Sequence, residues 1–155
     1  MDQPRSAPIQ VIPFSYENLL SILPEPSIPI ESCSICSQIP AYVDCLVRSG
    51  ELQHNDIPPI VKQLRPFLRL GEHVNTNWIE ICPMCRRLYY VEHTYEYLVY
   101  GSEDYDAYIR KTPAELIKLS EISWAAAVQS EIHQFANGEW AIIKETKKES
   151  SIKSL

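Results

Sequence analysis

Two C-x-x-C motifs constrain the fold of this chain more than any other feature. They are Cys33-Ser-Ile-Cys36 and Cys82-Pro-Met-Cys85, and 45 residues lie between them. Together they supply four thiolates, which is enough to close a tetrahedral zinc shell with Zn–S distances of about 2.3 Å. The two-residue spacer allows both sulfurs of a motif to face one ion. We therefore predict that these four cysteines share one metal ion and that an insertion folds between the two motifs.

The cysteine count disfavours a disulfide framework. The chain has five cysteines, the fifth being Cys45, whereas disulfide scaffolds usually pair an even number. The alternatives are reduced thiols in a core and two independent redox pairs. A thioredoxin-like pair precedes a helix, but a strand-like run follows Cys85. Because four thiolates leave a bound zinc ion no open position for water, we expect a structural role for the metal.

The two motifs resemble the paired knuckles of zinc-ribbon and rubredoxin-type proteins. The resemblance covers the knuckles and the strand expected after each, and it implies a zinc ion or, in a rubredoxin-like centre, iron. Proteins of both types usually have glycine directly after the second cysteine of a knuckle, where this chain has Ser37 and Arg86. Glycine tolerates positive φ best. This departure weighs more against iron than against zinc.

The N-terminal half predicts short elements on either side of the first knuckle. A helix capped by Ser15 is expected through Leu23. The alternation over 41–47 favours a strand, with a short helix ending at Gly50 as the alternative. A helix is expected over 58–70, kinked at Pro66, and a strand over 78–81.

The C-terminal half predicts one long strand and one long helix. Strict alternation over 88–99 indicates a half-buried strand, and the apolar spacing over 103–110 favours a helical turn. Thr112-Pro113-Ala114-Glu115 forms a capping box. It is expected to begin a helix that ends at Asn137-Gly138, with a restart possible at Ser120. A final strand is expected over 140–143.

These elements predict an α+β fold. It consists of a small antiparallel sheet with paired C-x-x-C knuckles that share one metal, packed by several helices. Residues 1–14 are expected to form an extended arm and residues 15–143 a single zinc-knuckle domain. Residues 144–155 are rich in lysine and serine, and we expect a disordered tail there.

A faint internal repeat follows the knuckles. Tyr42-Val43-Asp44-Cys45 comes shortly after the first, and Tyr90-Val91-Glu92-His93 comes shortly after the second. In such a pair of knuckle–strand units, Cys45 and His93 occupy equivalent positions. They either contribute to a second polar or metal site or belong to the core, since a buried cysteine behaves as a small hydrophobe. The core interpretation is the stronger one.

Composition excludes several classes of function. The chain has 14 basic and 20 acidic residues and a formal charge of −6, which disfavours broad binding to nucleic acid or anionic membrane. No apolar run approaches the roughly 20 residues of a membrane span, and the first residues do not resemble a signal peptide. A cytoplasmic location is therefore expected. The four glycines form no phosphate loop, and common catalytic motifs are absent, so no enzymatic activity is expected.

The segment 88–109 is both acidic and rich in tyrosine. It contains seven of the nine tyrosines and five acidic residues, with no lysine or arginine. Tyrosine is enriched at protein interfaces, and the charge suits a basic partner. In the alternative interpretation, half of these tyrosines fill the core and the acids protect a sheet edge. The candidate partner-binding residues are Tyr90, Glu92, Glu96, Asp104 and Asp106.

Together these features predict a non-catalytic, zinc-stabilised module that binds a protein with a basic surface. Such a module acts as an adaptor, an accessory subunit or an inhibitor, by analogy with immunity proteins that mask basic nucleases. One alternative is a rubredoxin-like iron protein that carries electrons. The other is a zinc ribbon that binds nucleic acid through Lys62, Arg65, Arg69 and the lysine-rich tail.

Overall fold

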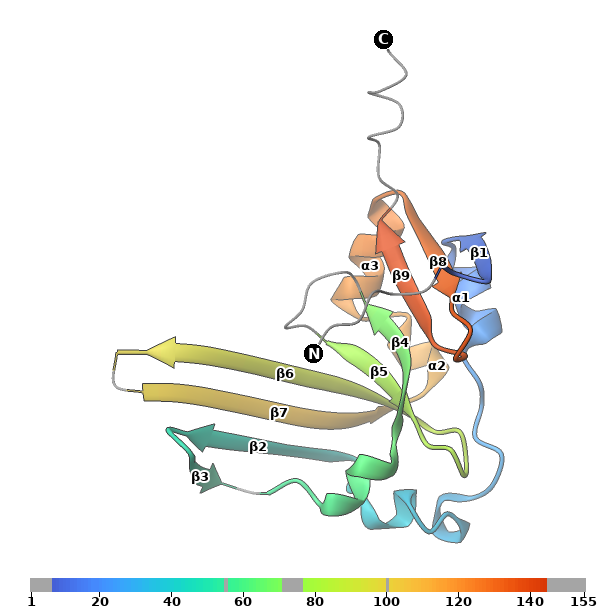
Figure 1. The fold of residues 1–155 in the computed structure, drawn as a ribbon. Coiled ribbons are helices and arrows are strands. Elements are labelled where there is room, and N and C mark those ends of the chain that lie inside the picture. Colours follow the sequence, from blue (N-terminus) through green and yellow to red (C-terminus); the bar gives the residue numbers. More distant parts are fainter. Residues whose placement is uncertain (1–6, 55, 71–76, 100, 145–155) are drawn as a thin grey trace.

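A single mixed sheet dominates the computed structural model, which describes residues 7–54, 56–70, 77–99 and 101–144. Nine strands of these residues form it, in the order β1-β8-β9-β4-β5-β6-β7-β2-β3 (Figure 1). All neighbouring strands are antiparallel except β4 and β9, which run parallel. The strands are β1 (Gln10–Pro13), β2 (Tyr42–Arg48), β3 (Glu51–His54), β4 (Arg65–Leu70), β5 (Trp78–Ile81), β6 (Leu88–Leu98), β7 (Gly101–Lys111), β8 (Ser130–Gln134) and β9 (Trp140–Lys144).

The helices are few and short. The α-helices of the described residues are α1 (Tyr16–Ile22), α2 (Pro113–Leu116) and α3 (Ser120–Ala127), and the 3-10 turns are η1 (Ile30–Ser32), η2 (Cys36–Gln38) and η3 (Pro59–Gln63). The expected α+β fold, a small antiparallel sheet packed by several helices, is therefore wrong. The chain instead forms a large mixed sheet with little helix.

Three segments expected to be helical account for the difference. In 58–70 only η3 is helical, and β4 includes Pro66 beside a register shift, where a strand tolerates proline. Lys62 therefore lies on η3, whereas Arg65 and Arg69 lie on β4. The expected helical turn at 103–110 is part of β7, which pairs with β2 and β6 on its two sides. Such pairing outweighs the local spacing of apolar residues.

The long C-terminal helix is also interrupted. α2 ends at Leu116, α3 ends at Ala127, and Ser130–Gln134 forms β8 between β1 and β9. Ile132 is fully buried in this strand. Its backbone pairs with Ile12 of β1 and Ile142 of β9, so the strand places this apolar side chain in the core.

Other expected elements are confirmed. Ser15 caps α1, with its Oγ accepting a hydrogen bond from the Asn18 backbone N–H at 2.9 Å. The capping box of α2 is complete: Thr112 Oγ1 accepts from the Glu115 N–H at 3.1 Å, and Glu115 Oε1 accepts from the Thr112 N–H at 2.9 Å. The strands expected over 41–47, 78–81, 88–99 and 140–143 are β2, β5, β6 and β9.

Each face of the central sheet has its own core. We call the first the helix-side core, because residues of α1, α2 and α3 join those of the sheet there; its largest fully buried members include Leu19, Leu68, Ile79, Leu116 and Ile122. The knuckle-side core gathers the two knuckles and η3. Its buried residues are Cys33, Ile35, Cys36, Ile39, Val61, Leu64, Cys82, Cys85, Tyr89 and Val91.

The strand β6 passes from the region between the two cores into solvent. Its first four residues, 88–91, are buried, whereas 94–97 are exposed. The far halves of β6 and β7, residues 92–98 and 101–107, extend away from the helices together with β2 and β3 (Figure 1). We call residues 92–98 and 101–107 the blade. At its tip Gly101 lies so close to Ser49 that a Cβ atom would stand 1.9 Å from the Ser49 Oγ, so the position requires glycine.

The N-terminal arm joins the sheet where it is described. Residues 10–13 form β1 and pair with β8, and Ile12 packs against the helix-side core. The expected tail lies outside the described residues, apart from Lys144 at the end of β9. Within the described part of the chain, no helix has the length and apolar character needed to cross a membrane.

The capping box yields a first prediction. Thr112→Ala should lower the free energy of unfolding by about 1 kcal/mol, because the Glu115 N–H then loses its side-chain acceptor. Thr112→Ser keeps the hydroxyl and should stay close to wild type. Chemical denaturation of the three proteins measures the difference, and equal losses in both variants would contradict a capping role.

Candidate metal centre

The two knuckles reach the centre from different parts of the sheet. The first lies between η1 and η2, and the second is the turn that joins β5 to β6. Cys82 follows β5 directly, and its backbone closes the turn: the Cys82 N–H donates to the Arg87 carbonyl at 2.9 Å, and the Arg86 N–H donates to the Cys82 carbonyl at 2.9 Å. The second knuckle is therefore held by the most central hairpin of the fold.

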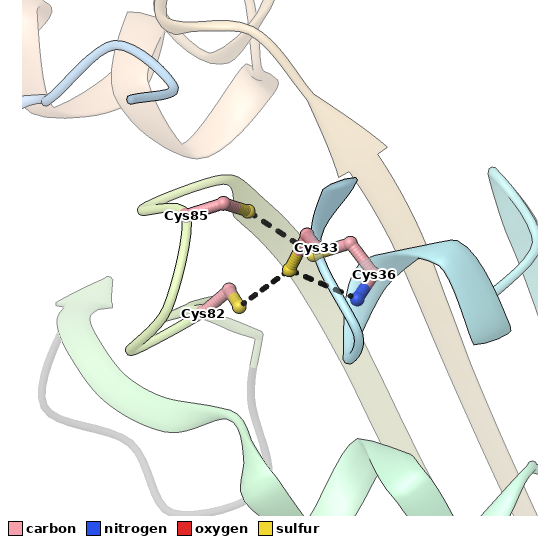
Figure 2. Close-up of side chains that lie close together, drawn as sticks. All are labelled: Cys33, Cys36, Cys82 and Cys85. Carbon is pink, nitrogen blue, oxygen red and sulfur yellow. Dashed lines mark hydrogen bonds between the residues drawn. The ribbon is translucent and has the colours of Figure 1, made fainter. Parts of the chain in front are cut away.

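The structure brings all four predicted cysteines together. Their Sγ atoms all lie within 4.8 Å of one another, and each side chain is fully buried. The Sγ atoms of Cys33 and Cys82 are 3.6 Å apart, and those of Cys36 and Cys85 are 3.4 Å apart (Figure 2). A tetrahedral shell with Zn–S bonds of about 2.3 Å has S–S edges of about 3.8 Å. The cluster could therefore hold one metal ion after only small movements of the sulfurs.

The electrostatics of the cluster also suit a cation. Burial raises the pKa of the Cys36 and Cys82 thiols above their ordinary value, because a thiolate without a counter-charge is poorly solvated there. Burial raises the pKa of Cys85 as well, but hydrogen bonding with the backbone and side chain of Arg87 and with the Cys36 and Cys33 thiols together outweighs it and brings the pKa to about 7. A metal ion supplies the positive charge that four buried thiolates require.

Backbone geometry shapes each knuckle differently. In the first knuckle the Cys36 N–H donates to the Cys33 sulfur at 3.3 Å (Figure 2). The Ser37 N–H donates to the Cys33 carbonyl at 3.0 Å. In the second, Arg86 adopts φ 69°, and Ser49 is the only other described residue besides glycine with positive φ. Arg86 thus occupies the left-handed position for which glycine is the preferred residue.

Residues that the sequence patterns did not single out support the first knuckle. Arg110 of β7 donates from Nε to the Tyr89 hydroxyl at 3.2 Å and from an Nη2 to the carbonyls of Cys36, at 3.3 Å, and Ile39. Its guanidinium also lies 5.5 Å from the centre of the Tyr89 ring. These residues are separated from the first knuckle by about half the chain, so spacing gives no signal for them.

The connector before the first knuckle is tied to the second. The Ser27 N–H donates to the Cys85 carbonyl at 2.9 Å, and an Arg87 Nη1 donates to the Ile28 carbonyl at 3.0 Å. Arg87 therefore contacts the connector directly, and its backbone and side chain help to lower the pKa of the neighbouring Cys85 thiol. Its position directly after a knuckle is the one sequence feature that indicates such a role.

The two knuckle–strand units of the faint repeat lie on either side of β7. Cys45 of β2 and His93 of β6 both face Asp106 in the strand register, and Tyr42 and Tyr90 both face Ile109. The His93 Nδ1 is 2.6 Å from Asp106 Oδ1. Within the described residues, however, the four-cysteine cluster is the only group of side chains arranged to hold a metal, and it includes neither Cys45 nor His93.

The five candidate partner-binding residues are distributed over three environments. Tyr90 is buried in the helix-side core, where its hydroxyl donates to Glu121 at 2.7 Å and accepts from Asn77 at 2.6 Å. Glu92 and Glu96 lie on one face of the blade. Asp104 and Asp106 lie on the opposite face, with Asp106 paired to His93. Of the five candidates, therefore, only the four acidic residues contribute to the blade surface.

Comparison of the chain with protein-family models, with curated proteins and with solved structures found no match. The class of the protein is defined by its site. Four buried cysteines from two knuckles, brought together by one sheet, make it a metal-binding module.

The cluster predicts one tightly bound metal ion per chain. Substituting serine at both Cys82 and Cys85 should abolish metal binding and lower the melting temperature, because metal binding is coupled to folding. Cys45→Ser, which alters a buried cysteine outside the cluster, should leave the metal content unchanged. Elemental analysis and thermal melting measure both effects, and full metal occupancy in the double variant would contradict the assignment.

The strained residue of the second knuckle yields a separate prediction. Arg86→Gly should raise the free energy of unfolding by about 1 kcal/mol, because glycine adopts positive φ without a Cβ clash. Arg86→Ala removes the same exposed side chain but keeps a Cβ, so it should bring no gain. Denaturant unfolding of the metal-loaded proteins distinguishes the two, and an equal gain in both would show that the side chain, not the backbone, causes the effect.

Proposed function

We propose that this protein is a non-catalytic, zinc-stabilised binding module whose blade contacts a partner protein with a basic surface. It acts as an adaptor, an inhibitor or an accessory subunit. The observation that carries the proposal is the blade itself, a projecting part of the sheet on which tyrosines and carboxylates lie uncovered.

Zinc is the metal that the donor set favours. Four thiolates complete a tetrahedral shell and leave no position for water or substrate, and the full burial of the cysteines keeps solvent away from the ion. Such an ion stabilises the fold but takes no part in chemistry. A rubredoxin-like iron ion uses the same four ligands, so elemental analysis and the visible spectrum must separate the two metals.

Exposed tyrosines give the blade its apolar contact area. Tyr95 is 51% exposed and Tyr97 is 84% exposed, and their ring centroids are 6.4 Å apart on one face of β6. A tyrosine side chain offers a large, rather rigid contact surface with a polar end, which is why it is frequent at interfaces. On the other face Tyr105 of the blade shares a hydrogen bond of 3.1 Å with the hydroxyl of Tyr42, a 53% exposed residue at the start of β2 beside the blade.

Negative charge on the blade favours a basic partner. Glu96 faces Glu103 directly across β6 and β7, and like charges in this position repel. Arg48 pairs with Glu103 at 2.8 Å, which leaves Glu96 uncompensated within the pairs formed by the described residues. Asp104 adds a carboxylate on the opposite face. A partner that presents lysine or arginine would relieve this repulsion and associate faster at low salt.

The same strands connect the metal centre to the blade. β6 begins three residues after Cys85, and β2 begins four residues after the end of η2. The direction of both strands is therefore set close to the cluster. In this proposal zinc does not touch the partner; it holds the strands that present the contact surface.

The acidic surface can be tested by neutralising it. Changing Glu92→Gln, Glu96→Gln and Asp104→Asn should slow association with a partner captured from native lysate and flatten its salt dependence, because the steering charge is lost. Asp106 is left intact since it pairs with His93. Association rates at several salt concentrations are the measurement, with metal content and melting temperature expected to stay near wild type.

A matched control changes the same charge elsewhere. Glu17, Glu25 and Glu31 are exposed residues of α1, the connector and η1, and replacing them with glutamine should leave association nearly unchanged. If the blade triple and the control triple slow association equally, net charge rather than the blade governs binding. Indifference to the blade triple contradicts the proposed surface.

A further inference from the structure

A basic pocket lies at the opposite end of β6 and β7 from the blade tip. Its volume is about 220 Å³, and it is bordered by the connector after α1, the second knuckle, the start of β6, the end of β7 and α2. The apolar part of its lining consists of Pro24, Pro26, Ala41, Leu88 and Pro113. The proposed function makes no use of it.

The charge of this pocket contrasts with that of the protein. Arg86, Arg87, Arg110 and Lys111 all line it, whereas Glu115 is the one acidic residue among its lining residues. The whole chain carries a formal charge of −6 and has 14 basic residues. Placing four cations around one small pocket costs free energy through mutual repulsion, and an anionic ligand would reverse that cost.

The cations of the pocket outnumber its acids. In the part of the chain that the structure describes, none of the four forms an ion pair with a carboxylate. The Thr112 N–H and, to a smaller extent, nearby Lys111 lower the pKa of the Glu115 carboxyl, so this carboxylate partly balances the lysine. With four cations and one carboxylate among its lining residues, the pocket keeps a net positive charge.

Two of the guanidinium groups are held in place before any ligand arrives. Arg87 donates from Nη1 to the Ile28 carbonyl at 3.0 Å, and Arg110 donates to Tyr89 and to carbonyls of the first knuckle. A guanidinium has five N–H donors, so each group keeps donors beyond these contacts. Ordering them on binding costs little because they are already ordered.

We infer that this pocket binds a phosphate monoester with a small apolar substituent. Arginine recognises phosphoryl oxygens through paired N–H donors, and four cations suit a dianion better than the single charge of a carboxylate. Pro24, Pro26 and Ala41 offer apolar contacts for the substituent. The volume admits a phosphoryl group with one ring or a short chain, not a large ligand.

Calorimetric titration of the full, metal-loaded chain tests the inference with three probes. Phenyl phosphate should bind with one saturable site. Inorganic phosphate lacks the apolar group and benzoate lacks the second charge, so each should bind at least about fivefold more weakly. Equal affinity for all three probes, or no saturable binding of phenyl phosphate, would overturn the inference.

A pair of matched variants locates the site. Arg86→Gln with Lys111→Gln removes two cations that line the pocket and should weaken phenyl phosphate binding at least about tenfold. Arg65→Gln with Lys62→Gln removes the same residue types from exposed positions outside it and should change the affinity less than about twofold. Equal weakening in the two variants would overturn the site. Elemental analysis checks that both variants keep their metal, and amide NMR shifts at Leu88 and Thr112 report binding directly.

Discussion

The meeting of four buried thiols is the constraint on which the rest of the structure depends. The cysteines make up four of the ten buried residues of the knuckle-side core, and they join segments separated by 45 residues of chain. Closing such a loop costs conformational entropy, and burying thiolates costs solvation. A shared metal ion would offset both costs at one point. Without it, the apolar side chains around the cysteines, such as Ile35, Leu64 and Val91, would have to hold the two knuckles together by packing alone.

The position of the cluster explains how one sheet can be both core and exposed surface. At the knuckle end, β5 and β6 are covered on both faces, with Ile79 and Leu88 toward the helices and Tyr89 and Val91 toward the knuckles. Beyond residue 91 neither core extends along β6. The strands continue because β7 pairs with β6 over eleven residue pairs and with β2 over seven. Backbone pairing therefore carries the blade beyond the region that side-chain burial stabilises.

Local patterns predicted the parts of this fold that depend on local physics. The meeting of the two knuckles was predicted from the four ligands that a tetrahedral metal requires, not from local spacing. By contrast, the caps at Ser15 and Thr112, the strand over 88–99 and the pairing of the cysteines within each knuckle follow from short spacings. The missing glycine at Arg86 also indicated a real feature, because that residue does adopt positive φ. Each of these depends on a few neighbouring residues and on a geometry that has few alternatives.

The features that local patterns did not predict depend on strands and side chains that are distant in the sequence. In β7, Tyr105, Tyr108 and Ile109 have helical spacing, yet the strand lies between β2 and β6, which satisfy its backbone on both sides. In the same way β8 exists because β1 and β9 flank it. Tyr90 belongs to an exposed-looking acidic segment, but its contacts with Asn77 and Glu121 place it inside. Pairing and burial of this kind leave no signature in spacing alone.

One strand, β7, links the blade, the basic pocket and the cysteine cluster. β7 contributes Asp104 and Asp106 to the blade, and Arg110 and Lys111 to the basic pocket. Arg110 also donates to the carbonyl of Cys36, one of the four clustered cysteines. The two knuckle–strand units flank this strand in matching register, with Cys45 and His93 both opposite Asp106. A shift of either knuckle would therefore move a neighbour of β7. Since strands in a sheet cannot slide by less than a full change of pairing, a metal ion bound by the four cysteines would help to hold β2, β6 and β7 in this register.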